Sequence, residues 1–144
     1  MMTKYLGCDV GTKTIGLAIS DDRGIIATPL ETVRRTKFTH DLEHMKRIIT
    51  DYTIEALVVG LPVHMDGSAG SRVQSIRAFA RNMTHATGLM VHFWDERLST
   101  SAVERMMLEA DLSRAKRAQH VDKLAAAYIL QGFLDAQGYE ALHI

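Results

Sequence analysis

Acidic side chains stand at the ends of apolar segments at three distant places in the chain. Asp9 ends an apolar run near the start of the sequence, and Asp122 begins an apolar helix. Between them, Asp95 and Glu96 end a further apolar run. In open α/β sheets, functional groups gather at the carboxyl ends of the strands, so we expect three carboxylates to meet in one cleft. That is the arrangement a two-metal phosphodiester site requires, with Mg²⁺ or Mn²⁺ as the predicted cofactor.

Asp9 and Asp122 each have a simpler explanation beside the catalytic one. Asp9 precedes Gly11, and Asp, Gly and Thr are ordinary turn residues. Asp122 at the start of a helix would be favoured by the helix dipole. From Leu124 to Leu134, however, that helix is apolar almost all round, so Asp122 is in line with a face that packs on the protein. A metal ion would compensate a buried carboxylate, and Gly11 and Gly16 would let backbone or ligand approach Asp9 closely.

The residues alone leave the choice between Asp95 and Glu96 open. Neighbouring side chains of a strand point to opposite faces, so only one of these acids can share a face with Asp9 if the strand continues regularly. Alternation groups Glu96 with Met90, His92 and Trp94, and it groups Asp95 with Leu89, Val91 and Phe93.

The hydrophobic pattern predicts that residues 1–144 form a single α/β domain. A change of period separates strands from helices. Strands are expected at 5–10, 14–20, 25–33, 55–62 and 89–94, and helices at about 38–49, 71–87, 103–110 and 120–136. The first three strands should form an antiparallel meander. The order β-β-β-α-β-α-β-α-α then predicts a mixed five-stranded sheet with helices on both faces.

Composition is that of an ordinary soluble protein. The chain carries 17 basic and 17 acidic residues, so net charge gives no support to nucleic-acid binding, although local basic clusters remain. No apolar run has transmembrane length, and we expect no membrane partner. The single cysteine, Cys8, excludes an internal disulfide and suits a reducing compartment, so a cytoplasmic location is expected. Cys8 itself is interpreted as a small core residue.

Four segments of the chain together resemble one known family. The segments "LGCDVGTKTIGLAISD", "VVGLPVHMDGS", "WDERLST" and "VDKLAAAYIL" occur in the order and at the spacing of the YqgF, or RuvX-like, family. Members of that family are described as Holliday junction resolvases or pre-16S rRNA nucleases. The family is similar to RuvC-type nucleases and has an RNase H-like fold, so the resemblance implies the same fold and a metal-dependent endonuclease.

The resemblance also assigns roles to the acids. Asp9, Glu96 and Asp122 match the three acidic positions of the family, which implies that they bind the metal and are catalytic. It thereby selects Glu96 over Asp95.

Nucleic-acid contacts are expected on either side of these acids. Arg97, Ser99 and Thr100 match the family's "DERLST" block, which implies that they position the phosphate or orient Glu96. Lys13, in the turn after Asp9, could meet a phosphate. The segment 113–123 has fewer basic residues than is usual in the family, which argues against tight electrostatic binding.

Several functions compete at this point. The resemblance favours maturation of the 5′ end of precursor 16S rRNA, with an RNA partner that could belong to a ribosomal particle. Holliday junction resolution on branched DNA is the main alternative and would favour a homodimer over a monomer. "DVGTKTIG" also resembles the first phosphate-binding segment of the actin, sugar-kinase and Hsp70 group, but a single domain and the "DERLST" block suit a nuclease better. A weakly active binding factor in transcription or ribosome assembly is a further alternative.

Overall fold

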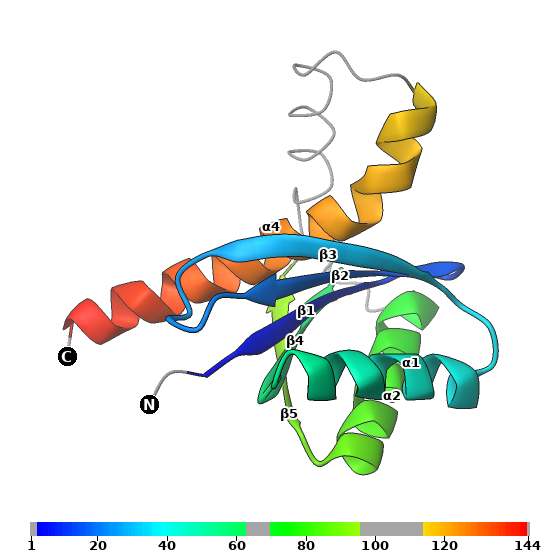
Figure 1. Cartoon of the computed structure of the whole chain (residues 1–144), viewed down its shortest axis with the longest axis horizontal. Helices are drawn as coiled ribbons and strands as arrows, with labels where there is room; N and C mark the ends of the chain where they lie inside the picture. Colours follow the sequence, from blue (N-terminus) through cyan, green and yellow to red (C-terminus); the bar gives the residue numbers. More distant parts are fainter. Residues whose placement is uncertain (1–2, 63–69, 96–113, 144) are drawn as a thin grey trace.

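A mixed five-stranded sheet forms the centre of the molecule (Figure 1). The computed structural model describes residues 3–62, 70–95 and 114–143, and within the last range the side chains of residues 122–136. Its elements in chain order are β1 (Tyr5–Val10), β2 (Thr14–Ser20), β3 (Ala27–Arg34), α1 (Phe38–Asp51), β4 (Ala56–Leu61), α2 (Gly70–Thr87), β5 (Met90–Asp95) and α4 (Arg114–His143). The spatial order of the strands is β3-β2-β1-β4-β5.

Strand pairing follows the expected plan. The first three strands pair antiparallel as a meander, whereas β4 pairs parallel with β1 and β5 pairs parallel with β4. β1 therefore lies at the centre, with its carboxyl end next to the turn into β2. The predicted mixed α/β sheet is confirmed. Of the predicted helices, the one at 103–110 lies outside the described residues.

The turn between β2 and β3 explains why β3 begins two residues later than predicted. The carboxylate of Asp21 accepts hydrogen bonds from the backbone N–H groups of Ile25 (2.7 Å) and Ile26 (3.1 Å). These bonds engage the N–H groups of both isoleucines in an Asx-type turn, β3 begins at Ala27, and the side chains of both isoleucines are exposed. The same bonds lower the pKa of Asp21, because they stabilise the ionised carboxylate.

Helices cover both faces of the sheet. α1 and α2 pack on one face against Leu6, Cys8 and Val10 of β1, whereas α4 packs on the other. Cys8 is fully buried, which confirms its interpretation as a core residue. Burial, followed by the nearby charge of Asp9, raises the pKa of its thiol to about 12. In the described part of the chain, no helix is long and apolar enough to cross a membrane.

α4 is longer than its apolar pattern predicted. It begins at Arg114, so Asp122 is not at its start but in its third turn. The residues before position 120 are good helix formers that lack an apolar stripe, and hydrophobic periodicity therefore missed them. The expected apolar face is confirmed, since Ala126, Ile129 and Phe133 are buried in a core cluster. Tyr128 of the same helix is 45% exposed, so the almost continuous apolar pattern of this helix is not buried all round.

Candidate active site

Asp9 and Asp122 are brought to the same point of the sheet by Gly16. In the ladder between β1 and β2, Asp9 is the partner of Gly16. A Cβ atom added to Gly16 would overlap the carbonyl carbon and oxygen of Asp122, and it would lie 2.9 Å from the backbone nitrogen of Lys123. The backbone of α4 therefore rests directly on β2 at this glycine. A close approach of backbone is thus confirmed at Gly16, and the approaching backbone is that of the Asp122 helix. At Gly11 the atoms nearest to an added Cβ belong to Thr14 of the same turn.

The length of α4 removes the simpler explanation of Asp122. A carboxylate gains from the helix dipole only within the first turn, and Asp122 is in the third. Its side chain is partly buried against the sheet.

A threonine hydroxyl holds the carboxylate of Asp122. Oγ1 of Thr14, the first residue of β2, donates a hydrogen bond to Oδ2 of Asp122. The two residues are 108 positions apart in the chain, so this contact belongs to the tertiary structure. Sequence reasoning missed Thr14, because a hydroxyl at the start of a strand carries no local signal of a distant partner. A donor to one oxygen restrains the rotamer of the carboxylate and so orients it.

The turn between β1 and β2 is fixed from two sides. The Gly11 N–H donates to the Thr14 carbonyl at 2.8 Å and closes the hairpin. From the end of β3, Nη1 of Arg35 donates to the Gly11 carbonyl at 2.6 Å, and the Arg35 N–H donates to the Lys13 carbonyl at 2.9 Å. The side chain of Lys13 is exposed at the tip of this turn, close in sequence to Asp9. Its contact with a phosphate stays a prediction.

The side chains of β5 show which face of the sheet Asp95 is on, relative to Asp9 and Asp122. The rings of His92 and Trp94 lie 5.0 and 6.1 Å from the ring of Phe133 of α4, centroid to centroid. Phe93 lies on the other face, with the guanidinium of Arg77 of α2 at 5.3 Å from its ring centroid. The predicted alternation is thus confirmed. It places Asp95 on the Phe93 face, away from α4.

The remaining predicted site residues are not placed by the structure. Glu96, Arg97, Ser99 and Thr100 lie outside the described residues. Their roles stay predictions drawn from the family pattern.

The donor chemistry at this point of the sheet fits a hard divalent cation. Within residues 3–62, 70–95 and 114–143, no group of three His, Cys, Asp or Glu side chains could hold a metal ion. Asp9 and Asp122 supply two carboxylates there, and the third predicted ligand, Glu96, is outside those ranges. An all-oxygen set of carboxylates suits Mg²⁺ or Mn²⁺ and does not suit the softer transition metals.

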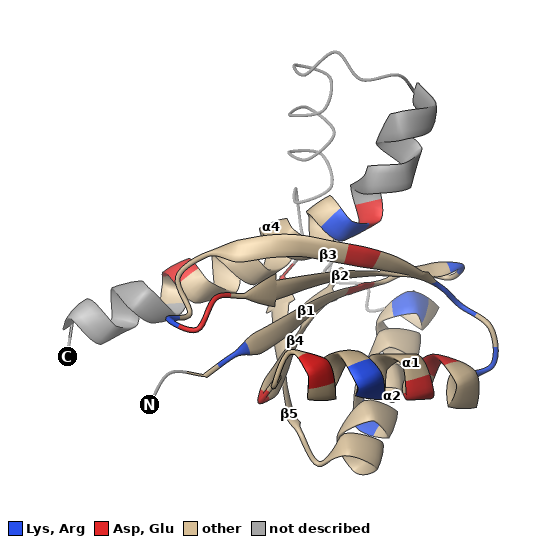
Figure 2. Ribbon diagram, in the orientation of Figure 1, with Lys and Arg blue, Asp and Glu red and all other residues tan. Residues whose placement is uncertain are grey.

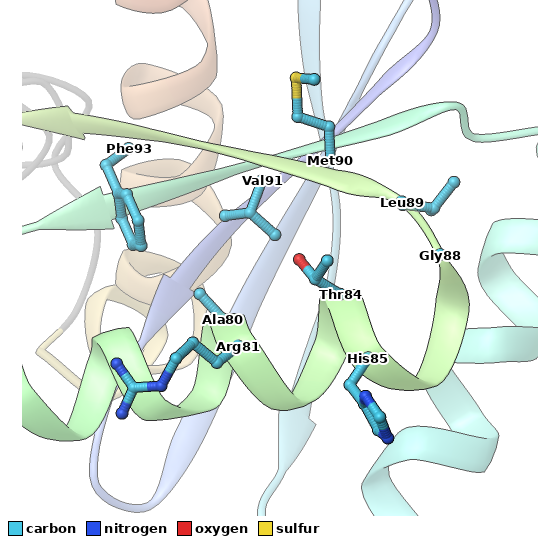
Figure 3. A pocket seen from close by; sticks show the side chains of 9 residues that line it. All are labelled: Ala80, Arg81, Thr84, His85, Gly88, Leu89, Met90, Val91 and Phe93. Atoms are coloured by element: carbon cyan, nitrogen blue, oxygen red, sulfur yellow. The ribbon is translucent and has the colours of Figure 1, made fainter.

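A cavity of about 680 Å³ lies elsewhere, between α2 and β5 (Figure 3). Val91 and Phe93 point from β5 toward α2, whereas Met90 points away from it. The cavity lies at the beginning of β5 and the end of α2, so it is remote from the carboxyl ends of the strands. It adds no group to the acids.

Curated relatives match most of the chain. A protein of Ruegeria sp. (strain TM1040) is 57% identical over 93% of this chain and 85% of its own length. A protein of Rhodobacter capsulatus is 59% identical over 90% of this chain and 81% of its own length. Both carry the name "Putative pre-16S rRNA nuclease".

Solved structures show the same fold at low sequence identity. RuvC of Thermus thermophilus in complex with a Holliday junction substrate aligns with a TM-score of 0.57 and 17% identity, over 94% of this chain and 95% of that one. The fowlpox virus Holliday junction resolvase aligns with a TM-score of 0.58 and 11% identity, over 93% and 99%. The fold is thus that of the RuvC-like resolvases, as the resemblance implied.

A family model described as "RuvX: Holliday junction resolvase" matches residues 3–136. This range includes both acids at Gly16 and the whole of the sheet. The chain therefore belongs to the RuvX family, a family of nucleases.

Proposed function

We propose that this protein is a metal-dependent endonuclease that matures the 5′ end of precursor 16S rRNA. The observation that carries the proposal is the contact at Gly16, which brings Asp9 of β1 and Asp122 of α4 to one point. Two partly buried carboxylates at the carboxyl end of the central strand would repel a phosphate backbone unless a cation lay between them. The names of the relatives support RNA as the substrate.

Asp9, Asp122 and Glu96 would hold Mg²⁺ or Mn²⁺. Such an ion supplies a water nucleophile at neutral pH and stabilises the charge on the leaving oxygen of the phosphodiester. The chain does the positioning. Thr14 fixes the carboxylate of Asp122, and the hydrogen bonds of Arg35 hold the turn that ends β1.

Basic and hydroxyl side chains would hold the substrate beside these acids. Lys13 is exposed on the turn after Asp9, where its ammonium group can contact a phosphate as a point charge. We assign the same task to Arg97, Ser99 and Thr100 from the family pattern. These contacts would orient the scissile phosphate toward the carboxylates.

Holliday junction resolution is the second candidate. The description of the family model favours it, as does the Holliday junction substrate in the complex of Thermus thermophilus RuvC. It would require a branched DNA substrate and a symmetric dimer that cuts two strands across a two-fold axis. We place it second because the relatives at 56–59% identity are named for rRNA.

Cleavage of two substrates by the same preparation tests the proposal. A precursor 16S rRNA fragment and a four-way DNA junction are incubated with Mg²⁺, Mn²⁺ or EDTA. Asp9→Asn and Asp122→Asn should lower the cleavage rate by roughly 10² or more, since a lost metal ligand removes several kcal/mol of charge stabilisation. Asp135→Asn, at an exposed acid of the same helix, is the matched control and should cut at the wild-type rate.

Three outcomes separate the candidates. RNA cleavage that EDTA and both variants abolish supports the proposal. Cleavage of the junction alone transfers the assignment to Holliday junction resolution. If neither substrate is cut although RNA binds, the acids are not catalytic and the protein is a binding factor.

Calorimetric titration of Mn²⁺ gives an independent measurement, because Asp9→Asn and Asp122→Asn should each weaken metal binding while Asp135→Asn does not.

A further inference from the structure

A polar cavity of about 530 Å³ lies at the carboxyl end of β1, on the face of the sheet that α1 and α2 cover. We propose that it binds a phosphate group of the nucleic-acid backbone, next to the phosphate that is cut. The inference rests on the proposed nuclease function. Three segments line the cavity: the turn after β1 with Val10, Gly11 and Thr12, the residues after β3 with Arg35 and Thr36, and the first turns of α2 with Ser71, Arg72, Ser75 and Ile76.

Arg35 is a cation held in place for a ligand. One of its N–H groups donates to the Gly11 carbonyl at 2.6 Å, and its guanidinium lies 5.8 Å from the ring centroid of Phe79. A carbonyl and a ring orient the guanidinium, but neither cancels its charge. Within the described chain, no salt bridge involves Arg35. A guanidinium has five donors, so those that the carbonyl does not engage remain for an anion.

Across the cavity, α2 supplies a second arginine and further hydroxyl donors. Arg72 is exposed on the first turn of α2, next to Ser71 and one helical turn before Ser75. Val10 and Ile76 are buried and form an apolar floor. Arginines and hydroxyl groups are the side chains that most often bind phosphate oxygens in nucleic-acid complexes. The combination predicts a phosphate ligand and disfavours an apolar one.

Basic residues are found in all three segments that line this cavity, and these segments lie at one end of the sheet (Figure 2). The turn after β1, the connection between β3 and α1, and the beginning of α2 all carry Lys or Arg at the same end of the sheet. The protein has no net charge, so the molecule as a whole does not attract the phosphate backbone of a nucleic acid. This local cluster of basic residues supplies that electrostatic attraction.

The cavity and the acids lie on two sides of one strand end. Val10 lines the cavity, and its neighbour Asp9 points to the opposite face, where α4 lies. The turn that follows β1 lines the cavity with Gly11 and Thr12 and directly follows Asp9 and Val10 in the sequence. A nucleic-acid strand that crosses this turn would place one phosphate at the acids and another in the cavity. The cavity would therefore determine how the substrate is positioned, without taking part in the chemistry.

A pair of charge reversals on one helix tests the inference. Arg72→Glu and Arg81→Glu make the same change in net charge at two exposed arginines of α2, but Arg81 lines the other cavity. Binding of a fluorescent single-stranded fragment of precursor 16S rRNA is followed by anisotropy in EDTA, which excludes cleavage. Arg72→Glu should weaken binding about tenfold and reduce the slope of log K against log salt by about 0.7. Arg81→Glu should change the dissociation constant by less than about twofold.

Inorganic phosphate separates the two sources of the ligand. If the cavity recognises phosphate, inorganic phosphate should compete with RNA for the wild type and for Arg81→Glu, and much less for Arg72→Glu. Inorganic phosphate could instead raise the melting temperature of the wild type but not of Arg72→Glu, while both bind RNA equally well. In that case the ligand is a free phosphate compound, and the assignment to the nucleic-acid backbone is overturned. Equal losses of RNA affinity in the two variants would overturn the proposal that the cavity binds phosphate. A wild type that does not bind RNA would overturn it as well.

Failure of this inference can be told apart from failure of the proposed function. A wild type that binds RNA through Arg72 but never cuts contradicts the nuclease and leaves the cavity standing. If the wild type cuts RNA and Arg72→Glu binds RNA as well as Arg81→Glu does, only the proposed phosphate site in the cavity is contradicted. Thermal unfolding of both variants checks that each is folded, which is expected because both side chains are exposed.

Discussion

The substitution Gly16→Ala tests the contact on which the site depends. Its new methyl group would overlap the carbonyl of Asp122 and lie 2.9 Å from the backbone nitrogen of Lys123. Ordinary contact begins at 3.4 Å, so the nitrogen alone requires a shift of about 0.5 Å, and the carbonyl requires more. Backbone cannot rotate away as a side chain can. α4 must therefore move off β2, and Asp122 moves with it.

The expected cost follows from that displacement. Overpacking of a core costs about 1–3 kcal/mol, and a clash with backbone belongs at the upper end. For a chain of 144 residues we expect the melting temperature to fall by roughly 10 °C. A misplacement of about 1 Å at a catalytic group can cost about 10²-fold in rate. At temperatures below the unfolding transition, the rate of RNA cleavage should therefore be at least about tenfold lower than that of the wild type. Calorimetry and single-turnover cleavage at a temperature where the variant is folded measure the two effects.

Gly7→Ala is the matched control. Gly7 lies on β1 beneath the same helix, and its added Cβ would meet Leu130 Cβ at 2.8 Å and the Ala126 carbonyl oxygen at 3.1 Å. These contacts are milder and lie further along α4 than Asp122. Gly7→Ala should lose about 1–2 kcal/mol of stability while the rate per folded molecule stays within about threefold. A Gly16→Ala variant that melts within about 2 °C of the wild type and cuts at the full rate would refute the reasoning.

Three further perturbations have definite expected results. Thr14→Val removes the donor to Asp122 and should lower kcat about tenfold with an unchanged KM, whereas Thr14→Ser should restore the rate. The thiol of Cys8, with its pKa raised to about 12, should not react with a disulfide reagent in the folded protein. Above the ordinary thiol pKa of 9.0, the thiol of Cys8 loses its proton in the unfolded chain but keeps it in the folded one. The free energy of unfolding should therefore fall as pH rises from 9.0 toward 12. Cys8→Ala should reduce this fall, as measured by denaturant titrations. Asp41→Ala removes the acceptor of the Thr36 N–H and hydroxyl before α1 and should cost about 1–2 kcal/mol in the same titrations, with Asp41→Asn losing less.

The sheet could be predicted from the sequence because its signals are local. The alternation of Ile15, Leu17 and Ile19 predicted β2 at 14–20, as observed. The order of elements then led to the fold class. The start of α4 could not be predicted in this way, because the polar segment before position 120 has helix propensity without an apolar stripe.

The site could be predicted only in part. Strand ends and the family pattern pointed to Asp9 and Asp122, and the structure brings both to Gly16. Thr14 was missed, and so was the contact of Arg35 with the Gly11 carbonyl, because each acts on a segment far away in the sequence. No local pattern records such a partner, whereas an acid at a strand end is visible in the sequence itself.

The packing of α4 has a consequence for the order in which activity appears during folding. The core cluster on its face of the sheet is built from α4 together with residues of the first 60, and α4 is the last of the described elements to be synthesised. A nascent chain without it has an uncovered sheet face and lacks Asp122. Docking of this helix therefore closes the core and completes the pair of acids in one step. If Asp122 is catalytic as proposed, a growing polypeptide that still lacks this helix would not cut RNA.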